Sequence, residues 1–435
     1  MSRNRIDVHA HYIGGSVSHR LSNELAAAWT ADAAIEFMDR FEIATQVLSV
    51  PGDVLAVIRN QGDPDRYARF IRAVNEEYAE LIRAYPRRFG AFAAVAFGTA
   101  GQALDEIRHA LDELGLDGVA LPRHDTGRYL GNPFYEPIFS ELARRGTPIY
   151  LHPAECPHIS DLSLGRQGWI VELPLDTART ITDAIFAGTF KRHPGLTMIL
   201  AHAGGALPAL AWRITEHANL SHTTYSAVGK HDDPGIDAAH VTHVLRNQLY
   251  YDTGIAGSPH SLLPALQVTG PDHILFGTDW PFVTATTVET LDQEMTALEK
   301  TTDITLPDID RTNALPSSPA SPTDRAPCSE THPLGFLRGG GPPLELYSLV
   351  KAAPCIPAPE TRDPVPLKLT FADSGHPARS RTWPRLRSPG TAGGATTTPS
   401  CVPASIPMPR RPGPGRLNCM SEVRHAIDAR NACRP

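Results

Sequence analysis

Histidine and aspartate side chains stand at the ends of four short apolar segments of this chain. The segments are Asp7–His11, Leu151–Pro153, Ala201–Gly205 and Gly277–Trp280, with the sequences DVHAH, LHP, AHAGG and GTDW. Neutral imidazoles and a carboxylate are typical ligands of a divalent metal ion such as Zn²⁺. The sequence therefore predicts a metal site that is assembled from segments far apart along the chain.

Four residues are the candidate metal ligands. His9 and His11 are two apart on a predicted strand, so both side chains point to one side, although two structural histidines would show the same spacing. His152 stands before a proline that ends its strand, and Asp279 follows an apolar run, where a helix N-cap is the alternative. Three His and one Asp leave an open position on Zn²⁺, and Mn²⁺ or Fe²⁺ accept the same ligand types.

His202 is the candidate for proton transfer. It follows an apolar run and precedes Gly204 and Gly205, which let the backbone approach a ligand closely. Because imidazole titrates near neutral pH, His202 suits acid–base catalysis. A fifth metal ligand is the alternative role.

Eight short apolar or β-branched runs are predicted to be the strands that position these residues. They are residues 6–9, 45–50, 89–95, 118–121, 148–151, 197–201, 249–252 and 273–277. Stretches with helical spacing lie between most of them and include residues 70–82, 104–114 and 288–300. Eight repeats over about 300 residues favour an α/β fold of the (β/α)₈ TIM-like barrel type over a doubly wound open sheet. Barrel strands end at one mouth, where this fold carries its chemistry.

Charge and cysteine content narrow the class of protein. Residues 1–315 hold 25 Lys and Arg against 39 Asp and Glu, a net charge of −14, which argues against nucleic acid as a partner. Cys156 is their only cysteine, as expected in a reducing compartment. The sequence shows neither an apolar signal core nor a run of about 18 apolar residues that could span a membrane. We expect a cytoplasmic protein without membrane contact.

Composition changes after Leu315. Residues 316–435 hold 22 of the 40 prolines and carry a net charge of +7. Such a segment cannot bury enough apolar surface to offset the loss of chain entropy on folding. We interpret residues 1–315 as the barrel and residues 316–435 as a low-complexity, disordered tail.

Six segments together resemble the amidohydrolase superfamily, and within it the branch of 2-amino-3-carboxymuconate-6-semialdehyde decarboxylase and 6-methylsalicylate decarboxylase. The resemblance extends over about residues 5–315. It is carried by the segments Ile6–Tyr12, Leu151–Pro153, Leu173–Arg179, Ala187–Pro194, Ile199–Gly205 and Leu275–Phe282.

The resemblance implies a distorted barrel with one divalent metal, usually zinc. It assigns the ligands and the catalytic residues, and it places Arg213 near the site as a substrate-binding residue that anchors a carboxylate or holds an ion pair. The implied ligands are His9, His11, His152 and Asp279, and the implied catalytic residues are His202 and Asp279. Binuclear members carry a carboxylated lysine on the fourth strand, whereas residues 118–122 read GVALP, which favours a single metal.

The resemblance also implies a reaction. We expect non-oxidative decarboxylation of an aromatic or muconate-type carboxylic acid, a small-molecule substrate, by a protein that can form a homodimer. Metal-dependent hydrolysis of a lactone or amide is the alternative, because one fold hosts both reactions. A barrel that only binds a ligand is a third hypothesis.

The family pattern breaks at Leu315. The run Ile309–Leu315 resembles the start of the family's closing helix, but the chain then reads Pro-Ser-Ser-Pro where a Leu-Phe-Pro type of ending is expected. Codons for that ending read as Pro-Ser-Ser-Pro when the reading frame is displaced. We therefore interpret residues 316–435 as a frameshift product, with a genuine disordered extension as the alternative.

Overall fold

The computed structural model describes residues 3–19, 29–60, 63–125, 127–154, 158–220 and 235–315. Cys156 and the predicted tail, residues 316–435, lie outside the described residues, so their interpretation stays a prediction.

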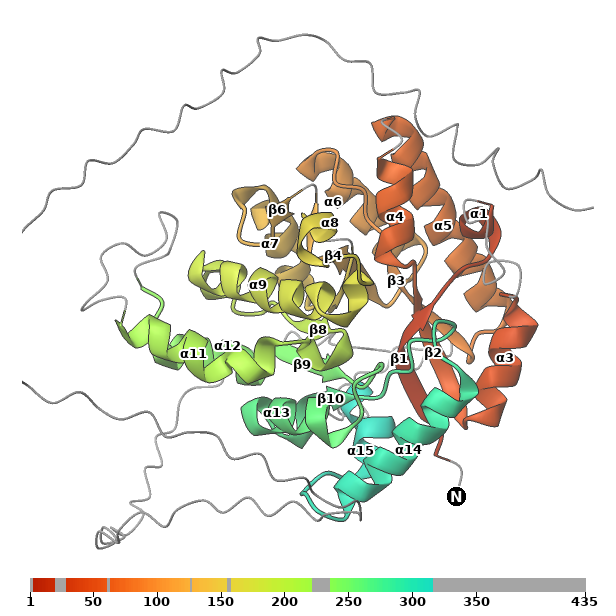
Figure 1. The fold of residues 1–435 in the computed structure, drawn as a ribbon. Coiled ribbons are helices and arrows are strands. Elements are labelled where there is room, and N and C mark those ends of the chain that lie inside the picture. Colours follow the sequence, from red (N-terminus) through yellow and green to blue (C-terminus); the bar gives the residue numbers. More distant parts are fainter. Residues whose placement is uncertain are drawn as a thin grey trace, which may run out of the picture. The chain divides into compact units, whose positions relative to one another are not determined.

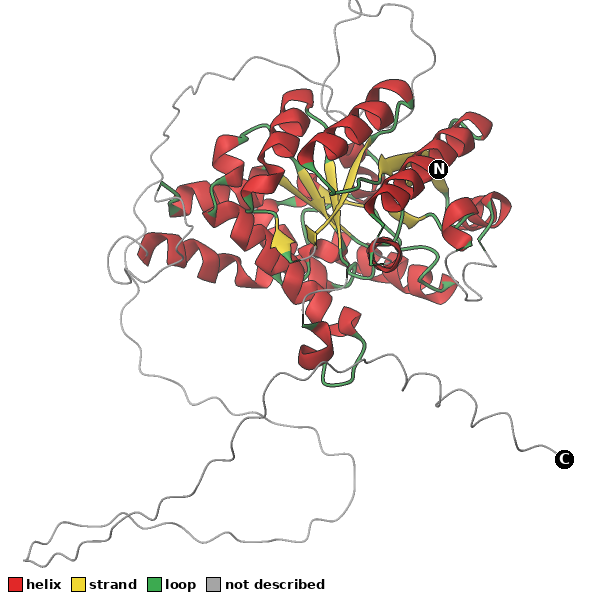
Figure 2. Ribbon diagram, turned by 90° about the horizontal axis from the view of Figure 1, so that it is seen from above, coloured by secondary structure: helices red, strands yellow, loops and turns green. Residues whose placement is uncertain are grey.

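Eight parallel strands form one sheet that curls into a barrel (Figures 1 and 2). In order around the sheet they are β1 (Arg5–His11), β2 (Ile43–Ser49), β3 (Phe89–Ala93), β4 (Gly118–Pro122), β7 (Ile149–His152), β8 (Met198–Leu200), β9 (Leu249–Asp252) and β10 (Ile274–Leu275). The barrel closes where the Val8 amide donates to Phe276 O (3.0 Å) and where Ala10 bridges to Trp280. The predicted TIM-like barrel and its eight strands are confirmed, with strand ends that differ by a few residues.

Helices surround the barrel on its outside (Figure 2). The α-helices are α1 (Gly15–Ser18), α3 (Ala31–Arg40), α4 (Gly52–Arg59), α5 (Pro64–Ala84), α6 (Ala100–Arg108), α7 (Glu136–Arg145), α8 (Ile159–Leu162), α9 (Glu172–Phe186), α10 (Thr189–Arg192), α11 (Leu207–Leu220), α12 (Ala238–Asn247), α13 (Pro259–Thr269), α14 (Ala285–Glu299) and α15 (Leu306–Asp310). Shorter helical turns are η1 (His109–Glu113, a π-helix), η2 (Pro133–Tyr135), η3 (Gly168–Ile170), η4 (His202–Gly204), η5 (Pro271–His273) and η6 (Thr312–Ala314). An antiparallel hairpin, β5 (His124–Asp125) and β6 (Arg128–Tyr129), follows β4 and was not predicted.

The helix predicted over residues 70–82 illustrates why these elements form. It is part of α5, whose N-cap Asp63 accepts a hydrogen bond from the Arg66 amide. Its apolar stripe, which includes Phe70, Val74 and Tyr78, is buried, so the helix is held by packing against the barrel.

The barrel interior holds a separate cluster of buried side chains. Its members come from most of the strands and pack as a solid core, as expected for this fold. They are Ile6, Val8, Val47, Phe92, Tyr150, Ile199, Ala201, Leu275 and Ala314.

A register shift within β1 changes which of its residues face the interior. Asp7 pairs with Gln46 and Ala10 pairs with Leu48, so three residue steps on β1 match two on β2. Such a β-bulge re-aims the side chains that follow it and is often found beside an active site. Ile6 and Val8 belong to the buried cluster of the barrel interior, and His9, within the shifted stretch, and His11, after it, meet at the carboxyl end of the barrel.

Arg5 of β1 forms ion pairs with α14 and α15. Its side chain is fully buried and lies over the Phe276 ring, 4.6 Å from the centroid. It donates to Asp292 of α14, and its Nε lies 3.3 Å from Asp310 Oδ1 of α15. Arg3 also contacts both carboxylates, at 3.1 and 2.7 Å. The network holds the end of the described chain against its beginning.

We expect Arg5→Met to lower the free energy of unfolding by about 3 kcal/mol, because it removes one partner of a buried ion pair and leaves Asp310 partly uncompensated. The measurement is denaturant unfolding followed by circular dichroism.

The matched control is Arg40→Ala. Arg40 of α3 pairs with Glu289 of α14, but this pair is exposed. The loss in free energy of unfolding should therefore stay below about 1 kcal/mol. Equal losses for the two variants would contradict the role assigned to Arg5.

Candidate metal centre

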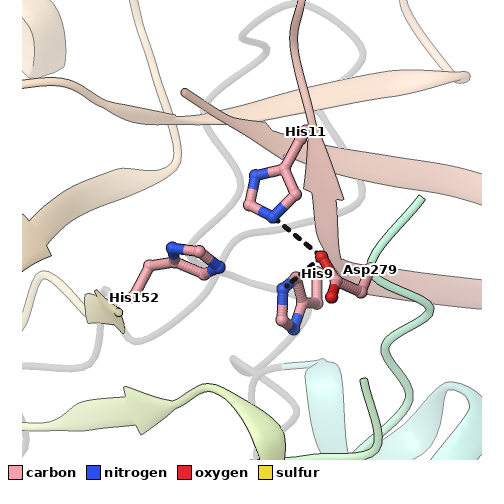
Figure 3. A group of neighbouring side chains, drawn as sticks. All are labelled: His9, His11, His152 and Asp279. Carbon is pink, nitrogen blue, oxygen red and sulfur yellow. Dashed lines mark ion pairs between the residues drawn. The ribbon is translucent and has the colours of Figure 1, made fainter. Parts of the chain in front are cut away.

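Four side chains converge at the carboxyl ends of the strands. They are His9 and His11 of β1, His152 at the end of β7 and Asp279 just after β10, and one ligand atom of each lies within 4.8 Å of the others (Figure 3). The Nε2 atoms of His9 and His11 are 3.2 and 3.0 Å from Asp279 Oδ1. The structure therefore brings together all four residues that the sequence predicts as ligands.

Several ring nitrogens of this cluster lack protein hydrogen-bond partners. The Nε2 atoms of His9 and His11 and both ring nitrogens of His152 are buried without one. Buried polar atoms are nearly always satisfied, so unsatisfied nitrogens that face one another call for a ligand. Three imidazoles and one carboxylate fit a single divalent cation.

The charge states of the cluster suit such a cation. Burial holds the pKa of His152 well below its ordinary value, so this imidazole is neutral. Burial also lowers the pKa of His9, but the carboxylates of Asp252 and Asp279 outweigh it and raise that pKa to about 10. A cation at His9 therefore displaces a proton, which makes its binding weaker as the pH falls.

Asp279 is held in place by backbone and by a second carboxylate. Its amide donates to His9 O (2.7 Å), and its φ of 69° is unusual for a residue other than glycine. The preceding Thr278 donates its hydroxyl and its amide to the buried Asp7, at 2.7 and 3.0 Å. Asp7 also accepts from Gln46 of β2 (3.1 Å), so this carboxylate joins three strands below the ligands.

His202 lies beside the cluster at the start of η4. Its ring centroid is 4.8 Å from that of His9 and 5.9 Å from that of His152. Its Nδ1–H donates to Gly254 O (2.8 Å), which leaves Nε2 as the free nitrogen. Burial lowers the pKa of His202, so its imidazole is neutral near pH 7 and Nε2 carries a lone pair.

Asp252 is a site residue that the sequence analysis missed. It ends β9, and its Oδ2 lies 2.9 Å from His9 Nδ1. The sequence carried a signal for it, because Asp252 ends a predicted strand in the same way that Asp279 follows one. A carboxylate at the end of a buried apolar run needs a partner in either case.

A pocket lies at the same face of the barrel, where Pro122 and Ala154 line it at the carboxyl ends of β4 and β7, although none of the four clustered side chains lines it. It has a volume of about 350 Å³ and is lined by residues of α4, of the β5–β6 hairpin and of the segment after β7. Its polar wall includes Arg59, His124 and Asp125, and its apolar wall includes Leu55 and Phe97. This size and this mixture are typical of a small-molecule site.

Arg213 is not part of this centre within the described residues. It is exposed on α11 and lines a different pocket, of about 390 Å³, together with Phe186 and His217. Its predicted role in substrate binding therefore stays a prediction that no described contact supports.

Comparison of this chain with known proteins identifies its family. The model of the amidohydrolase family matches residues 6–315. The 6-methylsalicylic acid decarboxylase acuB of Aspergillus aculeatus is 32% identical over 290 residues, which cover 64% of this chain and 84% of that protein. The γ-resorcylate decarboxylase of Rhodococcus jostii is 26% identical over 267 residues, which cover 58% and 77%.

A solved structure has the same fold. The dihydroxybenzoic acid decarboxylase of Polaromonas sp. JS666, with bound manganese and the inhibitor 2-nitroresorcinol, superposes with a TM-score of 0.60 at 23% identity. The match covers 72% of this chain and 95% of that one. The family match over residues 6–315 confirms the resemblance seen in the sequence, and this chain belongs to the amidohydrolase family.

Proposed function

We propose that this chain is a metal-dependent carboxy-lyase that decarboxylates an aromatic or muconate-type acid without oxidation. The observation that carries the proposal is the convergence of three imidazoles and one carboxylate, with the ring of His202 beside them. The decarboxylases among its relatives support this choice of reaction.

The four clustered residues, His9, His11, His152 and Asp279, would hold one divalent cation. A cation there supplies a Lewis acid that polarises an oxygen of the substrate. The nitrogen-rich donor set favours zinc, and manganese is the second candidate, as bound by the Polaromonas decarboxylase. The absence of lysine from β4 favours one cation.

His202 is the group to which we assign proton transfer. In decarboxylation the bond between the ring carbon and the carboxylate breaks, carbon dioxide leaves, and the electron pair that stays on the carbon takes up a proton. We assign to the free Nε2 of His202 the uptake of that proton from solvent and its delivery to the carbon. Gly254 O keeps Nδ1 occupied, so only Nε2 is available for this exchange.

Hydrolysis of a lactone or amide is the second candidate function. The same four donors would serve it, and fold alone does not separate the two reactions. The pocket of about 350 Å³ at the same face of the barrel has a size suited to the small carboxylic acid substrate that we propose. No helix among the described residues is long and apolar enough to cross a bilayer.

We expect the purified chain to release carbon dioxide from one or more acids in a panel of 2-hydroxybenzoates, with 6-methylsalicylate among them. His202→Asn should lower kcat by about 10²–10⁴, the usual contribution of a general acid or base, while the metal content stays unchanged. Hydrolysis of lactones or anilides without release of carbon dioxide would favour the second candidate and contradict the first.

We expect about one divalent cation per chain after dialysis, and its loss in His152→Ala, because this variant removes one of the four donors. The metal content per chain is measured by inductively coupled plasma mass spectrometry. His217→Ala, a histidine on α11 outside the cluster, is the control and should keep the cation. Equal metal content in both variants would remove His152 from the ligand set.

A surface patch supports a homodimer as the assembled form. Six exposed apolar side chains lie within residues 162–175, and Trp212 is 76% exposed on α11, which packs against α9. The six are Leu162, Leu164, Trp169, Ile170, Val171 and Leu175. Exposed apolar side chains gathered on neighbouring elements are typical of a protein interaction surface. We propose a second copy of this chain as the partner.

We expect light scattering during gel filtration to give twice the chain mass of 47.1 kDa, and Trp212→Glu to shift the protein towards the single-chain mass. A charge placed in an apolar interface is costly because it loses its water. Val57→Glu, which changes an exposed apolar residue on α4 outside the patch, should leave the mass unchanged. A single-chain mass at all protein concentrations would contradict the dimer.

A further inference from the structure

The two carboxylate oxygens of Asp252 lie against three close donors, each at 2.9 Å, and against a fourth, the Tyr150 hydroxyl, at 3.5 Å. Oδ2 lies 2.9 Å from His9 Nδ1. Oδ1 accepts the backbone amides of His202 and Gly254, both at 2.9 Å. The carboxylate is fully buried, so these contacts set its environment.

The contact with Oδ2 decides which nitrogen of His9 can serve a cation. A carboxylate oxygen only accepts, so a His9 that gives up its Nε2 hydrogen to a cation keeps its other hydrogen on Nδ1, beside Asp252 Oδ2. The lone pair then lies on Nε2, the nitrogen that faces Asp279 and the cluster. A carboxylate behind a ligating histidine fixes the tautomer and the ring direction in this way.

The contacts with Oδ1 hold the segment that carries the second functional imidazole. His202 and Ala203 have φ values of 58° and 52°, in the left-handed region that costs free energy for residues other than glycine. Such a conformation persists only when its surroundings impose it. The His202 amide is fixed by Asp252, and its ring is fixed by Gly254 O, whose own residue also donates to Asp252.

We propose that Asp252 is a positioning residue that sets the tautomer of His9 for metal binding and, with the same carboxylate, holds the strained backbone of His202. This inference rests on the proposed function, because it assigns His9 to a cation and His202 to proton transfer. It extends that function to a residue that contacts neither the substrate nor the cation.

Asparagine in place of Asp252 separates the proposal from a simple structural role. The asparagine side chain has one accepting oxygen and one donating nitrogen. If its oxygen accepts the two backbone amides, its NH₂ faces His9 Nδ1, and His9 must move its hydrogen to Nε2, where it blocks the cation. If the side-chain amide is flipped, its NH₂ faces two backbone N–H donors. Only a carboxylate satisfies all three donors.

The test compares Asp252→Asn with a control of equal charge and burial. Asp176 on α9 is also fully buried; it accepts the Tyr129 hydroxyl at 2.6 Å and pairs with Arg179, outside the cluster. Each chain is stripped of metal, and its affinity for Zn²⁺ is then measured by competition with a chelator. Thermal unfolding of the stripped proteins reports on the fold.

We expect Asp252→Asn to bind Zn²⁺ about 10–100-fold more weakly than the unchanged chain, the range typical of lost partners behind a ligand, while Asp176→Asn binds within about twofold. Near-unchanged affinity in a folded Asp252→Asn protein would overturn the proposal. Because Zn²⁺ is the only ligand used, this result is independent of whether the chain decarboxylates any acid.

A second measurement on the unchanged chain covers the case in which Asp252→Asn does not fold. Nitrogen-15 NMR of histidine-labelled, Zn²⁺-loaded protein, with His9 assigned by comparison with His9→Gln, reports which ring nitrogen carries hydrogen. We expect hydrogen on Nδ1 and zinc on Nε2. Zinc on Nδ1 of His9 would overturn the proposal irrespective of the variant.

Discussion

The backbone pairing of β1 with the segment after β10 is the contact on which the site depends. The Asp279 amide donates to His9 O, and the His11 amide donates to Trp280 O, both at 2.7 Å. Residues some 270 positions apart are thereby fixed to each other by short hydrogen bonds, with Asp7 joining them from below through Thr278. A shift of these strands by one residue would move a candidate ligand by about 3.3 Å. The same pairing that closes the barrel therefore also assembles the cluster.

The charges around the cluster follow from the same closure. Asp252 and Asp279 bring two negative charges against His9, which explains why its pKa rises to about 10 in spite of burial. A divalent cation among the ligands would balance those two carboxylates and release the proton of His9. His152 contributes no charge, because burial keeps it neutral. The cluster is thus arranged so that one divalent cation neutralises it, which is the requirement for charged groups shielded from water.

The sequence predicted the ligands because each one ends a run of apolar residues, and a charged or ring-nitrogen side chain at such a place has few structural reasons to be there. It predicted the eight strands because buried parallel strands are short, apolar and separated by helical spacing. It could not predict the bulge in β1, which depends on the pairing of Asp7 and Ala10 with β2 and leaves no mark in local composition. The side chains of His9 and His11 nevertheless meet, as the alternation argument predicts, although His9 lies within the shifted stretch between Asp7 and Ala10.

Asp252 shows a different limit of sequence reasoning. Its proposed role depends on three donors, from β1, from the segment after β8 and from the segment after β9, and two of them are backbone amides. The end of a predicted strand marks Asp252 as a residue that needs a partner, but only the fold reveals which groups those partners are. The left-handed backbone at His202 belongs to the same class of feature, since its cost is met by contacts with β9 and the segment after it. The proposed positioning role of Asp252 is therefore visible only in the structure, whereas the four candidate ligands were already visible in the sequence.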